Sequence, residues 1–389
     1  MESNRSKMEK IPVNYCLFIL FANTLAFHAN TQGRAYSFTD DELIVYDAEN
    51  ETIPLDTTVH EGKKSLRLKQ NEIALLKDSD YDDFRLEVDM MGAGMAGIGF
   101  RSMDLFNYEF IYVRTESSGT ENSIQYVPLY NGATSWQLYN APEYETNASF
   151  NGNEWFHVTL IVQGDNLRLF INNSEDPRIE VELLRSDLSR GQILLKSEFD
   201  PVYYANVEIQ ELEARQSVSE PKEPADTHLT DWLISEPFPL NEGWLFWDTG
   251  SFLQSFEGWN QIAADRDGVI NLSKYVSHPI NAVAAKTVLT SESAVRRQLL
   301  FDYTHTLIIV LNSEILFYGK EMDDYGYVHD GEETIVLPLQ QGENELLFLI
   351  NGDAELYGEG VRYQGRTQCA NWGYVAKLDN YDGITIMAR

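Results

Sequence analysis

The stretch Asn166-Leu-Arg-Leu-Phe-Ile-Asn-Asn-Ser174 leads into Arg178-Ile-Glu-Val181, and Thr306-Leu-Ile-Ile-Val-Leu-Asn-Ser313 leads into Ile315-Leu-Phe-Tyr318 in the same way. In both, β-branched and aromatic residues flank a turn of Asn and Ser, which predicts an antiparallel β-hairpin. Two such hairpins, far apart in one chain, predict two tandem β-sandwiches.

The residues around these hairpins repeat the same short alternation. In Phe84-Arg-Leu-Glu-Val-Asp-Met90 every second side chain is apolar, which is typical of a half-buried strand. Similar runs, separated by Gly, Asn, Asp and Ser, continue from Tyr36 to Glu213 and resume at Trp232. No long stretch has the period of an amphipathic helix. The sequence therefore predicts an all-β protein made of two antiparallel β-sandwich, or jelly-roll, domains.

Length and composition give the domain boundaries. At 389 residues and 43% hydrophobic composition, the chain is long enough for two domains that each bury a core. The polar, proline-containing segment Gln216-Ser-Val-Ser-Glu-Pro-Lys-Glu-Pro-Ala-Asp226 interrupts the strand pattern. We expect domains over residues 36–213 and 231–389, joined by a linker at 214–230.

The N-terminal segment has the layout of a secretory signal peptide. Arg5, Lys7 and Lys10 precede the apolar run Tyr15-Cys-Leu-Phe-Ile-Leu-Phe-Ala22, and small and polar residues follow up to Gly33. We expect residues 1–33 to direct the protein to a secreted, periplasmic or cell-surface location. No later run reaches the ~18 apolar residues of a spanning helix, so no stable membrane span is expected.

The charge of the chain excludes one class of partner. With 61 acidic and 29 basic residues, the formal net charge is -32, which argues against binding to nucleic acid or to anionic membranes. The 7 His residues are scattered, and no zinc, Ser-His-Asp or phosphate-loop motif is present, so no metal site or cofactor is expected from motifs. Abundant carboxylates leave calcium open. Asp265-Arg-Asp-Gly-Val-Ile-Asn271 lacks the spacing of an EF-hand and predicts a turn into a strand.

The strand Tyr108-Glu-Phe-Ile-Tyr-Val-Arg114 is the first candidate for ligand binding. If Ile111 and Val113 face the core, the aromatic side chains and Arg114 lie on the opposite face. Sugar rings pack on aromatic rings, while charged groups bind their hydroxyls. An alternative is that these aromatic residues fill a core on both faces. The residues predicted for this site are Arg101, Tyr108, Tyr112, Arg114, Gln125, Tyr126, Trp136 and Tyr139.

A second candidate lies in the C-terminal half. The loop Met322-Asp-Asp-Tyr-Gly-Tyr-Val-His-Asp330 follows the second hairpin and is acidic and aromatic. Tyr325 and Trp372 are its predicted sugar platforms. The alternative is that the loop only packs against the domain.

The first domain resembles the concanavalin A-like, or laminin G-like, sandwich of the DUF1080 (3-keto-disaccharide hydrolase-like) type. The resemblance rests on the order of several short motifs, including Gly97-Ile-Gly-Phe-Arg101 and Trp155-Phe-His-Val-Thr-Leu-Ile-Val-Gln-Gly164. It implies Arg101 and Glu109 as polar site residues, with Glu109 as a catalytic acid or base. The second domain resembles galactose-binding-like jelly rolls through Leu337-Pro-Leu-Gln-Gln-Gly-Glu-Asn-Glu-Leu346.

Three functions follow from these observations. The first is a secreted carbohydrate-binding protein with two lectin-like modules, because the tandem sandwiches carry no complete catalytic motif. The second is a glycoside hydrolase in which the first domain is catalytic and the second an accessory sugar-binding module. The third is an adhesion module that binds protein on its sheet faces. The same sandwiches serve all three roles, so the fold alone does not choose among them.

Overall fold

A computed structural model describes residues 33–140, 142–213, 224–225, 227–238, 256–276, 282–320, 327–351, 362–363, 366–367 and 372–387. The described residues form antiparallel strands and two short 3-10 turns, η1 (Glu121–Ser123) and η2 (Leu272–Lys274). The prediction of an all-β protein with two sandwiches is confirmed. The predicted signal peptide, apart from residue 33, and residues 214–223 and 226 of the predicted linker lie outside the described residues.

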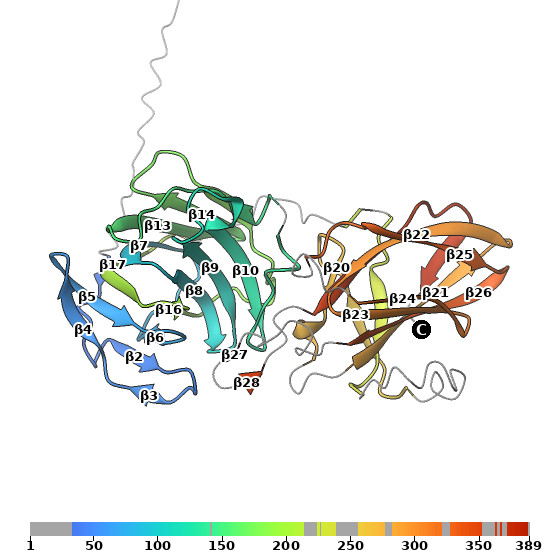
Figure 1. Ribbon diagram of the computed structural model, residues 1–389, viewed down its shortest axis with the longest axis horizontal. Helices are drawn as coiled ribbons and strands as arrows, with labels where there is room; N and C mark the ends of the chain where they lie inside the picture. The colour runs from blue at the N-terminus through green and yellow to red at the C-terminus, as the bar shows by residue number, and fades with distance from the viewer. Residues whose placement is uncertain are drawn as a thin grey trace, which may run out of the picture. The chain divides into compact units, whose positions relative to one another are not determined.

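Two sheets form the first sandwich, coloured blue to green in Figure 1. The eight-stranded sheet has the order β15 (Ile179–Glu182), β14 (Asn166–Ile171), β13 (Phe156–Gln163), β7 (Phe84–Gly92), β17 (Val202–Glu211), β5 (Lys63–Leu68) and β4 (Thr57–His60), with β1 (Arg34–Ala35) beside β17. The nine-stranded sheet has the order β11 (Ala133–Thr134), β10 (Ile124–Tyr130), β9 (Asn107–Arg114), β8 (Met95–Asp104), β16 (Gln192–Glu198), β6 (Ile73–Leu76), β2 (Leu43–Tyr46) and β3 (Thr52–Ile53), with β12 (Glu145–Thr146) beside β10.

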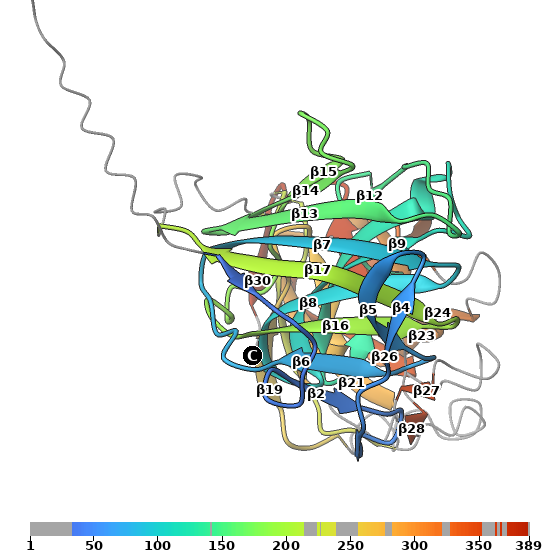
Figure 2. The same cartoon turned by 90° about the vertical axis from the view of Figure 1, so that its left-hand side faces the viewer.

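Alternating side chains build the core of this sandwich. Phe84, Leu86 and Val88 of β7 are fully buried, while Arg85 and Glu87 between them are partly exposed. Figure 2 shows β7 lying between β13 and β17, its two hydrogen-bonded neighbours. Apolar side chains from both sheets fill the space between the layers.

The second sandwich has one larger and one smaller sheet. The seven-stranded sheet has the order β19 (Asn260–Ala263), β18 (Asp231–Ile234), β21 (Ala282–Ser291), β26 (Gly342–Asn351), β23 (Thr306–Leu311) and β24 (Glu314–Lys320), with β30 (Ile384–Met387) beside β21. The four-stranded sheet has the order β20 (Val269–Asn271), β29 (Gly373–Leu378), β22 (Val295–Tyr303) and β25 (Glu333–Leu339). A further pair, β27 (Arg362–Tyr363) and β28 (Arg366–Thr367), forms a two-stranded sheet.

Aromatic side chains dominate the core of the second sandwich. The ring of Trp232 lies 4.9 Å from Phe348 and 5.2 Å from Tyr374 between ring centroids. The indole N–H of Trp232 donates to the carbonyl oxygen of Leu229 at 2.7 Å, so this buried donor is satisfied. No helix among the described residues is long and apolar enough to cross a membrane.

Every strand from β1 to β17 pairs only with strands of that range, and every strand from β18 to β30 pairs only within the second range. The two sets of sheets therefore have separate hydrogen-bond ladders. Residues 33–389 nevertheless form one compact unit. The proposed domain limits at residues 213 and 231 stay predictions.

Candidate functional site

The two faces of β9 carry different side chains. Ile111 and Val113 belong to the core between the sheets, while Tyr108, Phe110 and Tyr112 form a separate apolar cluster on the opposite face. This division was predicted from the alternation. The three aromatic side chains are, however, no more than 1% exposed. They form a packed layer and not an open platform.

Several of the predicted ligand-binding residues come together at the end of this layer. Gln125 of β10 lies opposite Tyr112 of β9, and the Tyr112 hydroxyl donates to the Gln125 side-chain oxygen. The Gln125 amide donates to the carbonyl oxygens of Trp136 at 3.1 Å and Tyr139 at 2.9 Å. The Arg114 guanidinium lies 5.1 Å from the centre of the Tyr112 ring. This arrangement holds the loop after β11 against the sheet.

Glu145 joins this group of residues, although sequence reasoning did not select it. Its strand β12 pairs with β10, and Glu145 lies opposite Gln125. Burial raises the pKa of the Glu145 carboxyl to about 7, an effect that the nearby Arg114 guanidinium partly offsets. A carboxyl group with this pKa exchanges protons near neutral pH, which is the property of an acid–base group.

Glu109 lies on the inner face of β9, away from this group. It is fully buried, accepts a hydrogen bond from the Tyr126 hydroxyl at 2.6 Å, and accepts another from the Arg185 amide at 3.0 Å. Burial raises its pKa to about 7, and the bonds to Tyr126 and Arg185 oppose the shift. Glu109 and Tyr126 therefore hold the segment at 184–185. A catalytic role for Glu109 stays a prediction.

Arg101 is also buried, with 3% of its surface exposed. Its guanidinium donates to the carbonyl oxygens of Gly164 at 2.6 Å, Asp82 at 3.3 Å and Leu188 at 3.3 Å. These contacts tie three loops of the first sandwich together. A binding role for Arg101 stays a prediction.

Of the two candidates of the second sandwich, only Trp372 lies within the described residues. Trp372 is 2% exposed and belongs to the aromatic core. Tyr325 lies outside the described residues. The role of both as sugar platforms stays a prediction.

A pocket of about 600 Å³ has walls from both sandwiches, and none of the ligand-binding residues predicted from the sequence lines it. Its apolar lining includes Leu138, Val269, Val328 and Val375. This size is within the range of about 300–1,000 Å³ that is typical of sites for small ligands. None of these side chains was selected from sequence.

The polar side of the pocket includes Tyr144 from the first sandwich and Arg266 and Asp267 from the turn before β20. The Tyr144 hydroxyl donates to the Asp267 carboxylate and lies 3.3 Å from an Arg266 nitrogen. Arg266 also forms an ion pair of 3.3 Å with Glu182. The pKa of Arg266 is raised, because these phenolic and acidic neighbours outweigh the opposing effect of burial.

His228, His329 and Asp330 line the same pocket. Both ring nitrogens of His228 are engaged, one with the Ala225 carbonyl oxygen at 3.2 Å and the other with Asp330 at 3.0 Å. Asp330 forms a second ion pair with Lys377 at 2.7 Å. Burial tends to raise the Asp330 pKa, but Lys377 and His228 hold it below its ordinary value. The pocket wall thus combines fixed charges with apolar surface.

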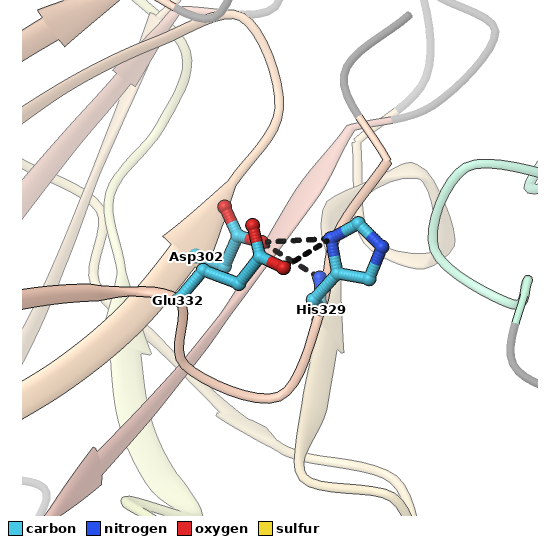
Figure 3. Close-up of side chains that lie close together, drawn as sticks. All are labelled: Asp302, His329 and Glu332. Atoms are coloured by element: carbon cyan, nitrogen blue, oxygen red, sulfur yellow. Dashed lines mark hydrogen bonds and ion pairs between the residues drawn. The ribbon is translucent and has the colours of Figure 1, made fainter. Parts of the chain in front are cut away.

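One group of residues beside this pocket has the composition of a metal site. Ligand atoms of Asp302, His329 and Glu332 lie within 4.8 Å of one another, as Figure 3 shows. Among the described residues this is the single such group of His, Cys, Asp and Glu side chains. Asp302 is far in sequence from His329 and Glu332, so no sequence motif contains all three residues.

One protein family matches the part of the chain that forms the first sandwich. Residues 29–210 match the family described as the 3-keto-alpha-glucoside-1,2-lyase-like domain. The matched residues cover almost all of the first sandwich. This match confirms the family resemblance predicted for this part of the chain. The resemblance of the second sandwich to galactose-binding-like jelly rolls stays a prediction, and no curated protein matches the chain.

Solved structures also resemble parts of the chain. The carbohydrate binding module CBM66 from Bacillus subtilis is 19% identical, with a TM-score of 0.33, over 41% of this chain and 92% of the module. A Bacillus subtilis protein of unknown function with a galectin-like fold is 10% identical, with a TM-score of 0.33, over 45% of this chain and 91% of that protein. Domain 4 of the arabinanase AbnA from Geobacillus stearothermophilus is 11% identical, with a TM-score of 0.29, over 43% of this chain and 81% of that domain. Likeness at this level carries no argument about function.

Proposed function

We propose that this protein binds carbohydrate in the pocket between its two sandwiches. The observation that carries the proposal is the composition of the pocket wall, where aliphatic side chains face Tyr144, Arg266, Asp267 and Asp330. A sugar presents apolar C–H faces and hydroxyl groups in one ring, and such a wall offers partners for both. The family match of the first sandwich, whose description names a glucoside, supports the same ligand class.

The proposal includes export of the protein, which the N-terminal sequence predicts. A chain with a net charge of -32 is suited to remain soluble after export. Edman sequencing or mass spectrometry of the protein recovered from the culture medium gives the cleavage site. Retention of residues 1–33 on protein that stays inside the cell would contradict export.

The binding proposal is tested by filling the pocket. Ala225 is exposed and lines the pocket, so Ala225→Trp places an indole in the open space with little cost to folding. We expect a glycan array to identify a bound oligosaccharide, and titration calorimetry with that oligosaccharide to show at least a tenfold weaker affinity for the variant, or about 1.4 kcal/mol.

Met103 provides the matched control, because it is 68% exposed and does not line the pocket. Met103→Trp introduces the same side chain on the first sandwich, outside the pocket lining, and should leave the affinity unchanged. Equal affinity of Ala225→Trp and Met103→Trp for the oligosaccharide would place binding outside the pocket. An array on which no glycan binds would contradict the proposal as a whole.

A second function is favoured by the family match together with Glu145. In a 1,2-elimination on a 3-keto-glucoside, a base removes the proton at C2, the C1–O bond breaks, and the departing oxygen takes up a proton. The sugar then keeps a C1–C2 double bond. Glu145, with a pKa of about 7, has the acid–base properties that the first step needs, and its carboxyl lies near Arg114 and Gln125, outside the pocket lining.

The test of this second function compares two carboxyl groups. With a 3-keto-glucoside as substrate, Glu145→Gln should lower the rate of product formation by about 100-fold or more, as expected for loss of a general base. Glu109→Gln should retain turnover if its role is structural. The reverse result would assign the chemistry to Glu109, and absence of turnover by the unmodified protein would leave binding as the function.

A further inference from the structure

Asp302, on β22 of the second sandwich, is a buried carboxylate that forms no ion pair with Lys or Arg among the described residues. It is 5% exposed, and its two oxygens accept hydrogen bonds from the backbone amides of Tyr303 at 2.8 Å and His329 at 2.7 Å. Within the described part of the chain, its ion-pair partner is the His329 ring and not a Lys or Arg. Asp330 differs, since it pairs with both Lys377 and His228.

Glu332 approaches the same imidazole on the same side as Asp302. The Nδ1 atom of His329 lies 3.7 Å from an Asp302 oxygen and 3.6 Å from a Glu332 oxygen. In Figure 3 both carboxylates point toward this one nitrogen. Hydrogen bonds of this type span about 2.7–3.2 Å, so neither carboxylate is bonded to the ring. The arrangement leaves two acceptors and one ring nitrogen around a common point.

The spacing of these atoms suits a shared metal ion. Two ligand atoms that each lie about 2.1 Å from one Zn²⁺ in tetrahedral geometry are about 3.4 Å apart. The observed 3.6 and 3.7 Å are close to this value. Asp302 is held by the backbone, while the Glu332 side chain is 69% exposed and free to adjust. The site therefore has one fixed carboxylate and one that closes on the ion.

We propose that Asp302, His329 and Glu332 bind one divalent transition-metal ion, of the Zn²⁺ or Mn²⁺ class, at the edge of the pocket between the sandwiches. One imidazole nitrogen with two carboxylates is a ligand set suited to these ions, whereas Ca²⁺ requires about 6–8 oxygen ligands. Three protein ligands also leave coordination positions open to water or to a ligand oxygen. His329 itself lines the pocket, so the ion borders the space proposed for sugar.

The site is tested on the full chain after removal of metals with a chelator. Titration with Zn²⁺ or Mn²⁺ against a chromophoric chelator should show one tight site per chain, with weaker binding of Ca²⁺. Glu332→Gln and His329→Gln alter exposed side chains and should each weaken this site by about 100-fold or more, since even residues that only orient metal ligands contribute about 10–100-fold.

Glu333→Gln is the matched control, because Glu333 is the exposed neighbour of Glu332 and is absent from the group of three. It should keep the affinity of the unmodified protein. Equal affinities of Glu332→Gln and Glu333→Gln would overturn the assignment, as would preferential binding of Ca²⁺. Circular dichroism of each variant confirms that the fold is retained. Because the readout is metal affinity, the result is independent of whether a sugar binds.

Discussion

At the scale of single residues, two tyrosines of the nine-stranded sheet show how equal burial hides different energetics. Tyr108 and Tyr126 are both fully buried. The Tyr126 hydroxyl donates to Glu109 at 2.6 Å and accepts from the Leu184 amide at 2.7 Å. The Tyr108 hydroxyl has no hydrogen-bond partner among the described residues. A buried hydroxyl without a hydrogen-bond partner lowers the stability of the fold, whereas a hydrogen-bonded one raises it.

The two tyrosines therefore give a matched pair of variants. We expect Tyr126→Phe to lower the free energy of unfolding by about 1–3 kcal/mol, because it leaves Glu109 and the Leu184 amide without this partner. Tyr108→Phe should leave stability unchanged or raise it by up to about 1 kcal/mol. Urea unfolding followed by fluorescence measures both. A loss of equal size in Tyr108→Phe would show that its hydroxyl has a partner.

At the scale of elements, the hairpin of β23 and β24 explains why its turn residues are Asn and Ser. Leu311 pairs with Glu314, so Asn312 and Ser313 alone connect the strands. Both have positive φ, 49° and 70°. Asn312 also fixes the turn, because its side chain donates to Asn344 and accepts from the Glu345 amide, each at 3.0 Å. Two consecutive left-handed residues match the twist of the flanking strands.

Replacing each turn residue by glycine should have opposite effects. Ser313→Gly relieves the steric cost of positive φ and should raise the free energy of unfolding by about 0.5 kcal/mol, after the greater freedom of the unfolded chain is counted. Asn312→Gly loses two side-chain hydrogen bonds and should lower it by about 1–2 kcal/mol. Thermal unfolding of both variants checks the signs. Stabilisation by Asn312→Gly would mean that its side-chain bonds contribute nothing.

At the scale of the whole molecule, buried acids couple stability to pH. Burial raises the pKa of Glu109 to about 7 and of Asp265 to about 6, from ordinary values of 4.5 and 3.8. At a pH between the unfolded and the folded pKa, each of these two carboxyl groups keeps its proton in the folded protein and has released it in the unfolded chain. The contribution of Glu109 and Asp265 to stability is therefore fully present below their unfolded pKa values and is lost as the pH rises through about 6–7.

We expect the free energy of unfolding to fall by about 4 kcal/mol between pH 5 and pH 8, because Glu109 contributes over about two pH units and Asp265 over about one, at about 1.4 kcal/mol per unit. Asp89 and Asp187 have lowered pKa values, so their contribution to stability is lost only when the pH falls below about 3.8, outside this range. In the double variant Glu109→Gln, Asp265→Asn, the free energy of unfolding, measured with urea at each pH, should change less between pH 5 and pH 8. An equal change of the free energy of unfolding with pH in both proteins would show that Glu109 and Asp265 do not cause the pH dependence.

Local patterns predicted much of the architecture. The alternation in β7 and β9 placed their side chains on the correct faces. The first strand of the second hairpin, β23, lies within the predicted stretch Thr306–Ser313. The central strand β21 was not predicted. Its sequence includes Ala282, Ala284 and Ala285, which have low strand propensity, and its position comes from pairing with β18, β26 and β30.

The sequence by itself determined the fold class, because the period of apolar side chains is a local property that both sheets of a sandwich require. It could not determine the exposure of Tyr112, since exposure depends on what packs over a strand. Nor could it bring Asp302 to His329, or Tyr144 to Asp267, because these residues meet only when distant strands and loops are packed. The tertiary structure alone decided the pocket and the candidate metal site, since both are formed by contacts between segments far apart in the chain.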